Sequence, residues 1–313
     1  MEKGQFADGF YKFDIGSVIW AAALSAIYLL LEIFVTGYRP DHLYFLIFCL
    51  TAYFAHPTTR KFVLGFSIFF IYGIIFDSMK GFPNYLFSDV RIEEPYNIEK
   101  FLFGIDTASG TITPNEYFLI YNSTFLDVLT GIFYINWMPI PLLFGLYLWL
   151  KDKAMFIRFS AAFFSVNVIG WTIYYSYPAA PPWYVQLYGF EEHFDIPGNV
   201  AGLIKFDQFF GITVFQDLYS KGSNVFAAMP SLHSAYPVVV FYYGLQKKVH
   251  WLVSAFFGVF VLGIWFSAVY SSHHYILDVA IGALCSISGI LIFEKILLKG
   301  KVGQWLAKLT EKV

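Results

Sequence analysis

The stretch Ser267-Ala-Val-Tyr-Ser-Ser-His-His-Tyr-Ile-Leu-Asp278 joins the last two long apolar segments of the chain. If the second of these segments starts as a helix at Tyr275, His274 and Asp278 stand four residues apart on one helical face. A carboxylate in that position holds the imidazole in one tautomer and leaves the other ring nitrogen free as a nucleophile or base. The sequence therefore predicts His274 as a catalytic nucleophile that is oriented by Asp278.

A second stretch, Met229-Pro-Ser-Leu-His-Ser-Ala-Tyr-Pro237, supplies another imidazole, His233, at the start of a further apolar segment. The preceding Pro230 and Ser231 are typical of the first residues of a helix. A helix that starts here directs His233 and several backbone N–H groups toward a common anion site. We therefore predict that His233 is catalytic and that Ser231 contacts the substrate.

The two stretches, read as Pro-Ser-x-His and Ser-x-x-Tyr-x-x-x-His-x-x-x-Asp, resemble the second and third motifs of the type 2 phosphatidic acid phosphatase and vanadium haloperoxidase superfamily. Three features resemble its inositol phosphorylceramide synthase branch, which aureobasidin inhibits in fungi: Leu232, the doubled His-His-Tyr, and Tyr177-Pro-Ala-Ala-Pro-Pro-Trp-Tyr184. The resemblance covers about 77–282. It implies a six-helix catalytic core and a metal-free phosphotransferase with a phosphohistidine intermediate on His274.

The phosphate-binding charges of the generic superfamily are missing from this sequence. Its first motif, Lys-x6-Arg-Pro, is absent, Ala268 replaces the Arg of the third motif, and Leu232 replaces the Gly of the second. These departures resemble the synthase branch and disfavour a plain phosphatase. The segment from Asp77 to Lys80 resembles a synthase sequence that usually carries Arg, so Lys80 either supplies charge for phosphate or is a snorkelling interfacial lysine.

Trp183 and Tyr184 follow a pair of adjacent prolines, which favour a stiff and extended backbone. An ordinary membrane protein carries such aromatic residues as an interfacial belt. The resemblance instead implies that these two side chains form a wall of the pocket for the lipid headgroup.

The composition excludes a soluble domain, since 58% of residues are hydrophobic, 13% are charged and the mean hydropathy is +0.59. We predict an all-α, multispanning transmembrane bundle. Two spans are shorter than the roughly 20 residues that a crossing helix needs, and the fourth is expected to break near its prolines. Within the first span, Glu32 is expected to form a helix–helix hydrogen bond or to snorkel. The predicted spans are about eight: 17–37, 43–55, 62–77, 125–150, 155–177, 232–246, 251–270 and 276–297.

The distribution of the 20 Lys and Arg residues predicts the orientation, because cytoplasmic loops collect positive charge. Most of them fall on the side that also holds both termini, so both termini are expected in the cytoplasm. The histidines then lie on the periplasmic or luminal face of a bacterial inner membrane or a Golgi membrane. We predict three regions: N-terminal transmembrane helices (1–76), a catalytic domain (77–298) and a cytoplasmic amphipathic tail (299–313).

Several partners and site types are not expected. The formal net charge of −2 gives no reason to predict nucleic-acid binding. His233, His273, His274 and Asp278 have side chains that can ligate zinc, but no paired histidines of the H-E-x-x-H kind occur. We therefore expect no metal and no cofactor, and we expect His273 to support the site rather than to react.

The predicted reaction moves inositol phosphate from phosphatidylinositol to a ceramide hydroxyl. The alternative within the superfamily is a phosphatase of lipid phosphates or lipid pyrophosphates, with water as the acceptor. A transporter that uses intramembrane histidines as a proton relay is disfavoured, because the motif residues cluster at one membrane face. The expected partners are lipid substrates and the membrane.

Overall fold

The computed structural model describes residues 14–194, 196–220 and 224–313 of the chain. The regular elements of the described part are helices, apart from one small antiparallel hairpin in which β1 (Ile105–Thr107) pairs with β2 (Gly110–Ile112) and Thr107 lies opposite Gly110. The prediction of an all-α fold is confirmed. The chain divides into two compact units, which we describe separately.

The N-terminal unit comprises the described residues up to Phe82 together with Lys301–Val313. Aspartate and proline residues define its helix starts: Asp14 accepts the Ser17 N–H at the start of α1, and proline is the first residue of both α2 and α3. The terminal helix packs on α3 and buries Leu306 and Leu309. The elements are α1 (Ile15–Val35), α2 (Pro40–Ala55), α3 (Pro57–Ser78), η1 (Met79–Gly81) and α15 (Lys301–Lys312).

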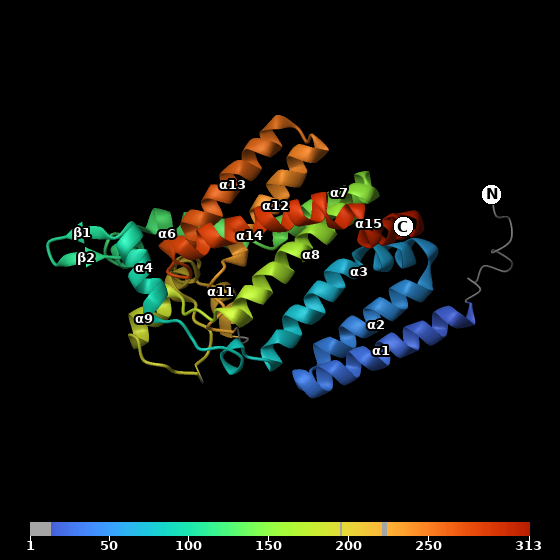
Figure 1. The fold of residues 1–313 in the computed structure, drawn as a ribbon, viewed down its shortest axis with the longest axis horizontal. Helices are drawn as coiled ribbons and strands as arrows, with labels where there is room; N and C mark the ends of the chain where they lie inside the picture. Colours follow the sequence, from blue (N-terminus) through green and yellow to red (C-terminus); the bar gives the residue numbers. More distant parts are fainter. Residues whose placement is uncertain (1–13, 195, 221–223) are drawn as a thin grey trace. The chain divides into compact units, whose positions relative to one another are not determined.

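The central unit, Pro83–Gly300, contains all of the motif residues except Lys80. Its longer helices alternate with short ones that lie in the segments 84–123 and 178–229 (Figure 1). The elements are η2 (Asn84–Leu86), α4 (Glu93–Phe103), α5 (Pro114–Ile120), α6 (Thr124–Ile135), α7 (Pro139–Lys151), α8 (Lys153–Ser176), α9 (Pro182–Tyr188), η3 (Ala201–Leu203), α10 (Ile204–Phe210), α11 (Val214–Ser220), α12 (Leu232–Lys247), α13 (Trp251–Tyr270), α14 (Ile276–Lys295) and η4 (Leu297–Lys299).

The bundle of the central unit is built around α12, which packs against α8, α13 and α14, while α6 packs on α13 and α7 on α8. A buried hydrogen bond from Tyr236 Oη to Asn167 Oδ1 (2.7 Å) joins α12 to α8. Gly282 of α14 lies so close to the Ser231 carbonyl oxygen that an added Cβ would clash with it. The starts of α12 and α14 therefore lie side by side, and these are the two ends that carry the motif residues.

Six helical segments of the described chain are long and apolar enough to cross a membrane: Ile15–Val35, Pro57–Gly81, Thr124–Lys151, Lys153–Ser176, Trp251–Tyr270 and Ile276–Lys299. The prediction of a multispanning membrane protein is confirmed. The other two predicted spans correspond to α2 and α12, which have 16 residues each, so the predicted number of spans stays a prediction. The expected break in the fourth segment is present between α6 and α7.

The described residues of the segments 84–123 and 178–229, which lie between predicted spans, form an outer layer of short helices that contributes to two buried hydrophobic clusters. Isolated backbone bridges join three extended segments of this layer, from Arg91 to Ala179 and from Ala179 to Ala227. The unit boundaries, at Phe82 and Gly300, lie near the predicted boundaries at 76 and 298. The terminal helix belongs to the same compact unit as α1–α3, and the roles assigned to the three regions stay predictions.

Candidate active site

The turn between α13 and α14 brings the third motif into a fixed shape. The Ala268 carbonyl accepts the backbone N–H groups of both His273 (3.1 Å) and His274 (3.0 Å). Asp278 Oδ2 accepts the N–H of Tyr275 (2.8 Å), the N-cap residue of α14. Because α14 begins only at Ile276, His274 lies just before the helix and not on its face, which corrects the expected start of this helix.

Both nitrogens of the His274 ring have partners. Nδ1 lies 3.0 Å from the Ala228 carbonyl oxygen and 3.6 Å from Asp278 Oδ2, while Nε2 lies 3.2 Å from Nδ1 of His233. A carbonyl oxygen only accepts, so it fixes the proton of His274 on Nδ1 and leaves a lone pair on Nε2. Asp278 is the carboxylate beside His274, as the spacing predicts, but the Ala228 carbonyl is the nearer partner of Nδ1.

The second motif begins α12, with Ser231 as the N-cap. Ser231 Oγ accepts the Ser234 N–H (3.3 Å), and the Ser231 N–H donates to the backbone carbonyl of Asp278 (2.9 Å). This last bond ties the start of α12 to the first turn of α14. His233 is half-buried, whereas His274 and Asp278 are buried. The structure gives Ser231 a capping role, and its predicted contact with substrate stays a prediction.

Aromatic rings surround the histidine pair. Tyr134 and Trp137, at the break between α6 and α7, lie with ring centroids 5.2 and 4.6 Å from that of His233. On its other side Tyr134 stacks on His273 (5.4 Å), and Tyr219 stacks on the same imidazole (4.5 Å). His273 is therefore packed against two tyrosines, and its support role stays a prediction.

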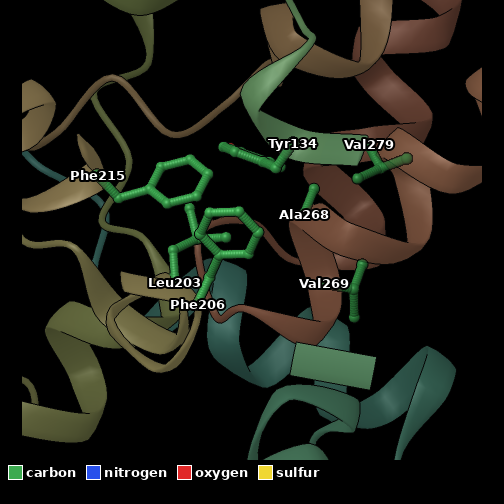
Figure 2. Packing of buried hydrophobic residues seen from close by; sticks show 7 residues of the cluster. All are labelled: Tyr134, Leu203, Phe206, Phe215, Ala268, Val269 and Val279. Atoms are coloured by element: carbon green, nitrogen blue, oxygen red, sulfur yellow. The ribbon is translucent and has the colours of Figure 1, made fainter. Parts of the chain in front are cut away.

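Ala268 belongs to a hydrophobic cluster that joins the outer layer to the bundle (Figure 2). Figure 2 shows Leu203, Phe206 and Phe215 beside Tyr134, with the Ala268 methyl group facing them. Ala268 is fully buried there. An apolar environment of this kind cannot hold the arginine that the generic superfamily has at this position, unless the arginine is paired.

Two buried polar residues of the outer layer hold the same turn through hydrogen bonds to its backbone. The Glu99 carboxylate accepts the N–H groups of Ile276 (2.9 Å) and Leu277 (3.0 Å), which are the first residues of α14. Asn115 Nδ2 donates to the carbonyls of Val269 (2.8 Å) and His274 (3.0 Å). Both side chains are fully buried, so they position the backbone that carries His274.

Burial decides the protonation of the groups in this turn. It lowers the pKa of His274 to about 4, against the opposing effect of the hydrogen bond to Ala228, and it lowers the pKa of His273 well below its ordinary value. It raises the pKa of Glu99 to about 7, although the two N–H groups that Glu99 accepts act in the other direction. His274 is therefore neutral at neutral pH, as a nucleophilic imidazole must be.

The remaining predicted site residues lie elsewhere. Trp183 and Tyr184 are buried in the outer layer. The backbone N–H of Trp183 donates to the Ser272 carbonyl (3.0 Å), and Tyr184 Oη donates to the Glu191 carbonyl (2.6 Å). Neither side chain is exposed as a residue of an interfacial belt would be. Lys80, in the N-terminal unit, pairs with Asp77 (2.8 Å). The substrate-binding roles of these residues stay predictions.

Sequence reasoning missed five contributors to this site: the Ala228 carbonyl, Glu99, Asn115, Tyr134 and Trp137. A backbone carbonyl leaves no mark in a sequence. The two polar residues stand among other charged and amide residues of a predicted loop, and the two rings belong to a chain with 22% aromatic residues. No pattern in the sequence distinguishes any of them.

Comparison with known proteins identifies the family of this chain. The PAP2 superfamily matches residues 102–292. The phosphoinositol dihydroceramide synthase of Bacteroides thetaiotaomicron is 45% identical over 277 residues, which cover 88% of this chain and 91% of that protein. The inositol phosphorylceramide synthase catalytic subunit of Saccharomyces cerevisiae is 26% identical over 278 residues, and these cover 82% of this chain and 63% of the subunit.

A third relative, the inositol phosphorylceramide synthase of Candida albicans, is 34% identical over 153 residues, or 46% of this chain and 31% of that protein. No solved structure matches. The family match spans more than half of the chain and includes both histidine motifs. The chain therefore belongs to the PAP2 superfamily and, within it, to the inositol phosphorylceramide synthase branch.

Proposed function

We propose that this chain is a membrane phosphotransferase that moves inositol phosphate from phosphatidylinositol to the hydroxyl of a ceramide-type lipid. The observation that carries the proposal is the 3.2 Å contact between Nε2 of His274 and Nδ1 of His233, with the other nitrogen of His274 held by a carbonyl. Two imidazoles at that distance can act on one phosphorus as nucleophile and as acid–base. The names of the relatives suggest the donor and acceptor lipids.

In the first half of the proposed reaction, Nε2 of His274 attacks the phosphorus of phosphatidylinositol. The N–P bond forms as the P–O bond to diacylglycerol breaks. His233, which starts this step as the imidazolium, gives its proton to the departing oxygen. The buried carboxylate of Asp278, 3.6 Å from Nδ1, stabilises the positive charge that develops on the His274 ring.

In the second half, neutral His233 takes the proton of the ceramide hydroxyl, and that oxygen attacks the phosphorus. The O–P bond forms, the N–P bond breaks and His274 returns to its neutral state. The net proton transfer is from the ceramide hydroxyl to diacylglycerol, so the site needs no external acid or base. In this scheme the His233 imidazole acts as the acid in the first half and as the base in the second.

The charge on the phosphate needs a partner in this scheme. We propose Arg91 for that role, on its place in the backbone ladder. Lys80, which the sequence resemblance suggests, is already paired with Asp77 (2.8 Å), and its role stays a prediction. The Arg91 guanidinium is half-exposed, lies 3.9 Å from Glu94 and is not buried in a close ion pair. Its strand pairs with residue 179, which pairs in turn with the strand that carries Ala228.

The preference for transfer over hydrolysis rests on Ala268 and Leu232. Both residues are buried and apolar, at positions where the resembled phosphatases have arginine and glycine. Placement of the site on the periplasmic or luminal face rests on the distribution of basic residues. A phosphatase of lipid phosphates would release inorganic phosphate from phosphatidic acid without ceramide, so the two functions differ in a single measurement.

The test uses purified protein with an inositol phosphate ester of an acidic phenol, which leaves without a proton. His233→Ala should release the phenol in one burst and then stall, with phosphoinositol held on His274 as an acid-labile adduct. With phosphatidylinositol the same variant should lose roughly 10²- to 10⁴-fold in rate. His274→Ala should show neither burst nor adduct.

Retention of the burst in His274→Ala, with its loss in His233→Ala, would exchange the two roles. If the wild-type protein turns over and neither variant ever forms an adduct, direct attack by the acceptor replaces the covalent mechanism. Rapid release of phosphate from phosphatidic acid by the wild-type protein, with no dependence on ceramide, would favour the phosphatase.

A further inference from the structure

The N-terminal unit contains an apolar cavity of about 470 Å³ between α1, α2 and α3. Its walls come from one face of each helix, with residues three or four apart, such as Leu24, Tyr28 and Leu31 on α1. The cavity follows α1 from Ser17 to Leu31, which is about 21 Å at about 1.5 Å per residue. This shape and its apolar lining suit one hydrocarbon chain.

A second cavity, of about 270 Å³, adjoins the first at the end of α1. Four residues line both cavities, so that the apolar space continues into the polar one: Tyr28, Phe45, Phe70 and Ile74. The other walls include Glu32, at the end of α1, and His42, at the start of α2. An amphiphilic molecule is the kind of ligand that fits such a pair, with its chain in one cavity and its head in the other.

The polar cavity contains groups that are costly to bury without partners. Glu32 is 1% exposed and His42 is 5% exposed. Glu32 Oε2 accepts the Thr36 hydroxyl (2.9 Å) and lies 3.5 Å from His42 Nε2, which is also 3.1 Å from Asp77 Oδ2. Among the described residues, none hydrogen-bonds His42 Nδ1, so a buried polar atom remains without a partner in the protein.

The charges of this cavity indicate which kind of head it accepts. Both cations at its edge are already paired: Arg39 with Asp41 (2.8 Å) and Asp77 (2.9 Å), and Lys80 with Asp77 (2.8 Å). Together with Glu32 the carboxylates outnumber these cations by one. A phosphate head would meet no free cation here, whereas hydroxyl and amide N–H groups would find acceptor oxygens.

We propose that the N-terminal unit binds one ceramide-type lipid, with a hydrocarbon chain in the apolar cavity and its hydroxyl and amide groups at Glu32 and His42. Such a head carries two hydroxyls and an amide N–H, whereas diacylglycerol offers a single donor. The binding site lies outside the catalytic residues, and it rests on the proposed function only for the lipid class. A divalent cation is disfavoured, because Arg39 and Lys80 already neutralise Asp77.

The test uses the full-length protein in phosphatidylcholine nanodiscs and a photoactivatable ceramide with the label in its chain. Mass spectrometry should find the cross-linked residues within 15–81. Ser25 lines the apolar cavity, so Ser25→Trp should lower this cross-linking by about fivefold or more through overpacking. The matched control is Ala26→Trp, which adds the same bulk to an exposed neighbour on α1 and should leave the yield unchanged.

The proposed position of the polar head of the ceramide is tested by Glu32→Gln. This substitution keeps the shape of the side chain but removes its charge. Cross-linking of the ceramide probe should fall by about tenfold, because a buried charge-assisted acceptor is lost. A photoactivatable phosphatidic acid with the same chain should label this unit weakly in the wild-type protein and should not respond to Glu32→Gln.

Equal labelling by the phosphatidic acid and ceramide probes would overturn the inference, as would loss of ceramide labelling on chelation of metal ions. Lipid transfer is measured on the same samples, so the two proposals fail separately. A protein that forms product but shows no ceramide label in 15–81 would overturn this site and leave the proposed function standing. A protein that is labelled in 15–81 but transfers no inositol phosphate would overturn the proposed function and leave this site standing.

Discussion

Replacement of Glu99 by glutamine tests whether the outer layer positions the catalytic turn. The carboxylate accepts the first two N–H groups of α14 with its two oxygens, at 2.9 and 3.0 Å. A glutamine has one carbonyl oxygen and one amide group that only donates, so one of the two N–H groups loses its acceptor. Glu99 is fully buried, and water does not replace the lost bond.

A buried N–H without a partner costs about 1–3 kcal/mol, which corresponds to roughly 5- to 150-fold in an equilibrium or a rate. If the cost falls on the geometry of His274, kcat for lipid transfer should drop by about tenfold or more within that range. KM for both lipids should change little, because Glu99 contacts the backbone of α14 and is not proposed to touch substrate.

The pH dependence separates this role from simple loss of stability. Burial raises the pKa of Glu99 to about 7 from an ordinary value of 4.5. Below pH 7 the folded protein therefore holds a neutral carboxyl group, which accepts one N–H well. Above pH 7 it holds a carboxylate that accepts both. Activity of the wild-type protein should rise through pH 7 on this account, and Glu99→Gln should lack that rise.

Stability should change with pH in the opposite direction. The folded state binds this proton more tightly than the unfolded state, so the group favours folding most below pH 4.5, and this contribution is lost as the pH rises to about 7. The difference corresponds to roughly 3 kcal/mol at about 1.36 kcal/mol per pKa unit. Thermal unfolding of the wild-type protein should show this loss as the pH rises from 4.5 to about 7, and Glu99→Gln should not.

The assay follows transfer to a fluorescent ceramide between pH 5.5 and 8.5, with Glu93→Gln as the matched control. Glu93 is an exposed glutamate on the same helix and has no contact with α14 that the described residues show. Its variant should behave as the wild-type protein. If Glu99→Gln keeps the wild-type kcat and pH profile, the positioning role is refuted. A large rise in KM at unchanged kcat would instead indicate a direct contact with substrate.

Four further outcomes are expected. Gly282→Ala should lower the free energy of unfolding by about 1–3 kcal/mol, because the added Cβ would clash with the Ser231 carbonyl oxygen. Thermal unfolding measures this change, and an unchanged melting temperature would contradict the packing of α14 on Ser231. Arg91→Ala should raise KM for phosphatidylinositol by about tenfold while KM for ceramide stays constant; no change in this variant would leave the backbone N–H groups of α12 as the phosphate site. A cysteine at exposed Glu192 should react with an impermeant thiol reagent only from the periplasmic or luminal side, and labelling from the cytoplasm alone would reverse the proposed orientation. Chelator treatment should leave lipid transfer unchanged, since the proposed steps use only side chains of the protein, and activity that is lost on chelation and restored by zinc would contradict them.

The features that could be predicted from the sequence are those that depend on residues close together in the chain. Hydropathy averaged over about 20 residues predicts the long membrane helices. Pro230 and Ser231 predict the start of α12, and a spacing of four residues predicts that His274 and Asp278 lie near each other. Family motifs preserve this local order, so the two histidines and the aspartate could be named before any fold was known.

The contacts that hold His274 become visible only in the tertiary structure. Ala228, 46 positions away, supplies the carbonyl that fixes its tautomer, and Glu99 caps α14 across a separation of 177 positions. Such contacts depend on how helices pack, and neither hydropathy nor helical periodicity records which distant backbone group will face a given side chain. The same reason applies to the lipid cavity, whose lining faces looked like ordinary apolar spans until α1, α2 and α3 were set against one another.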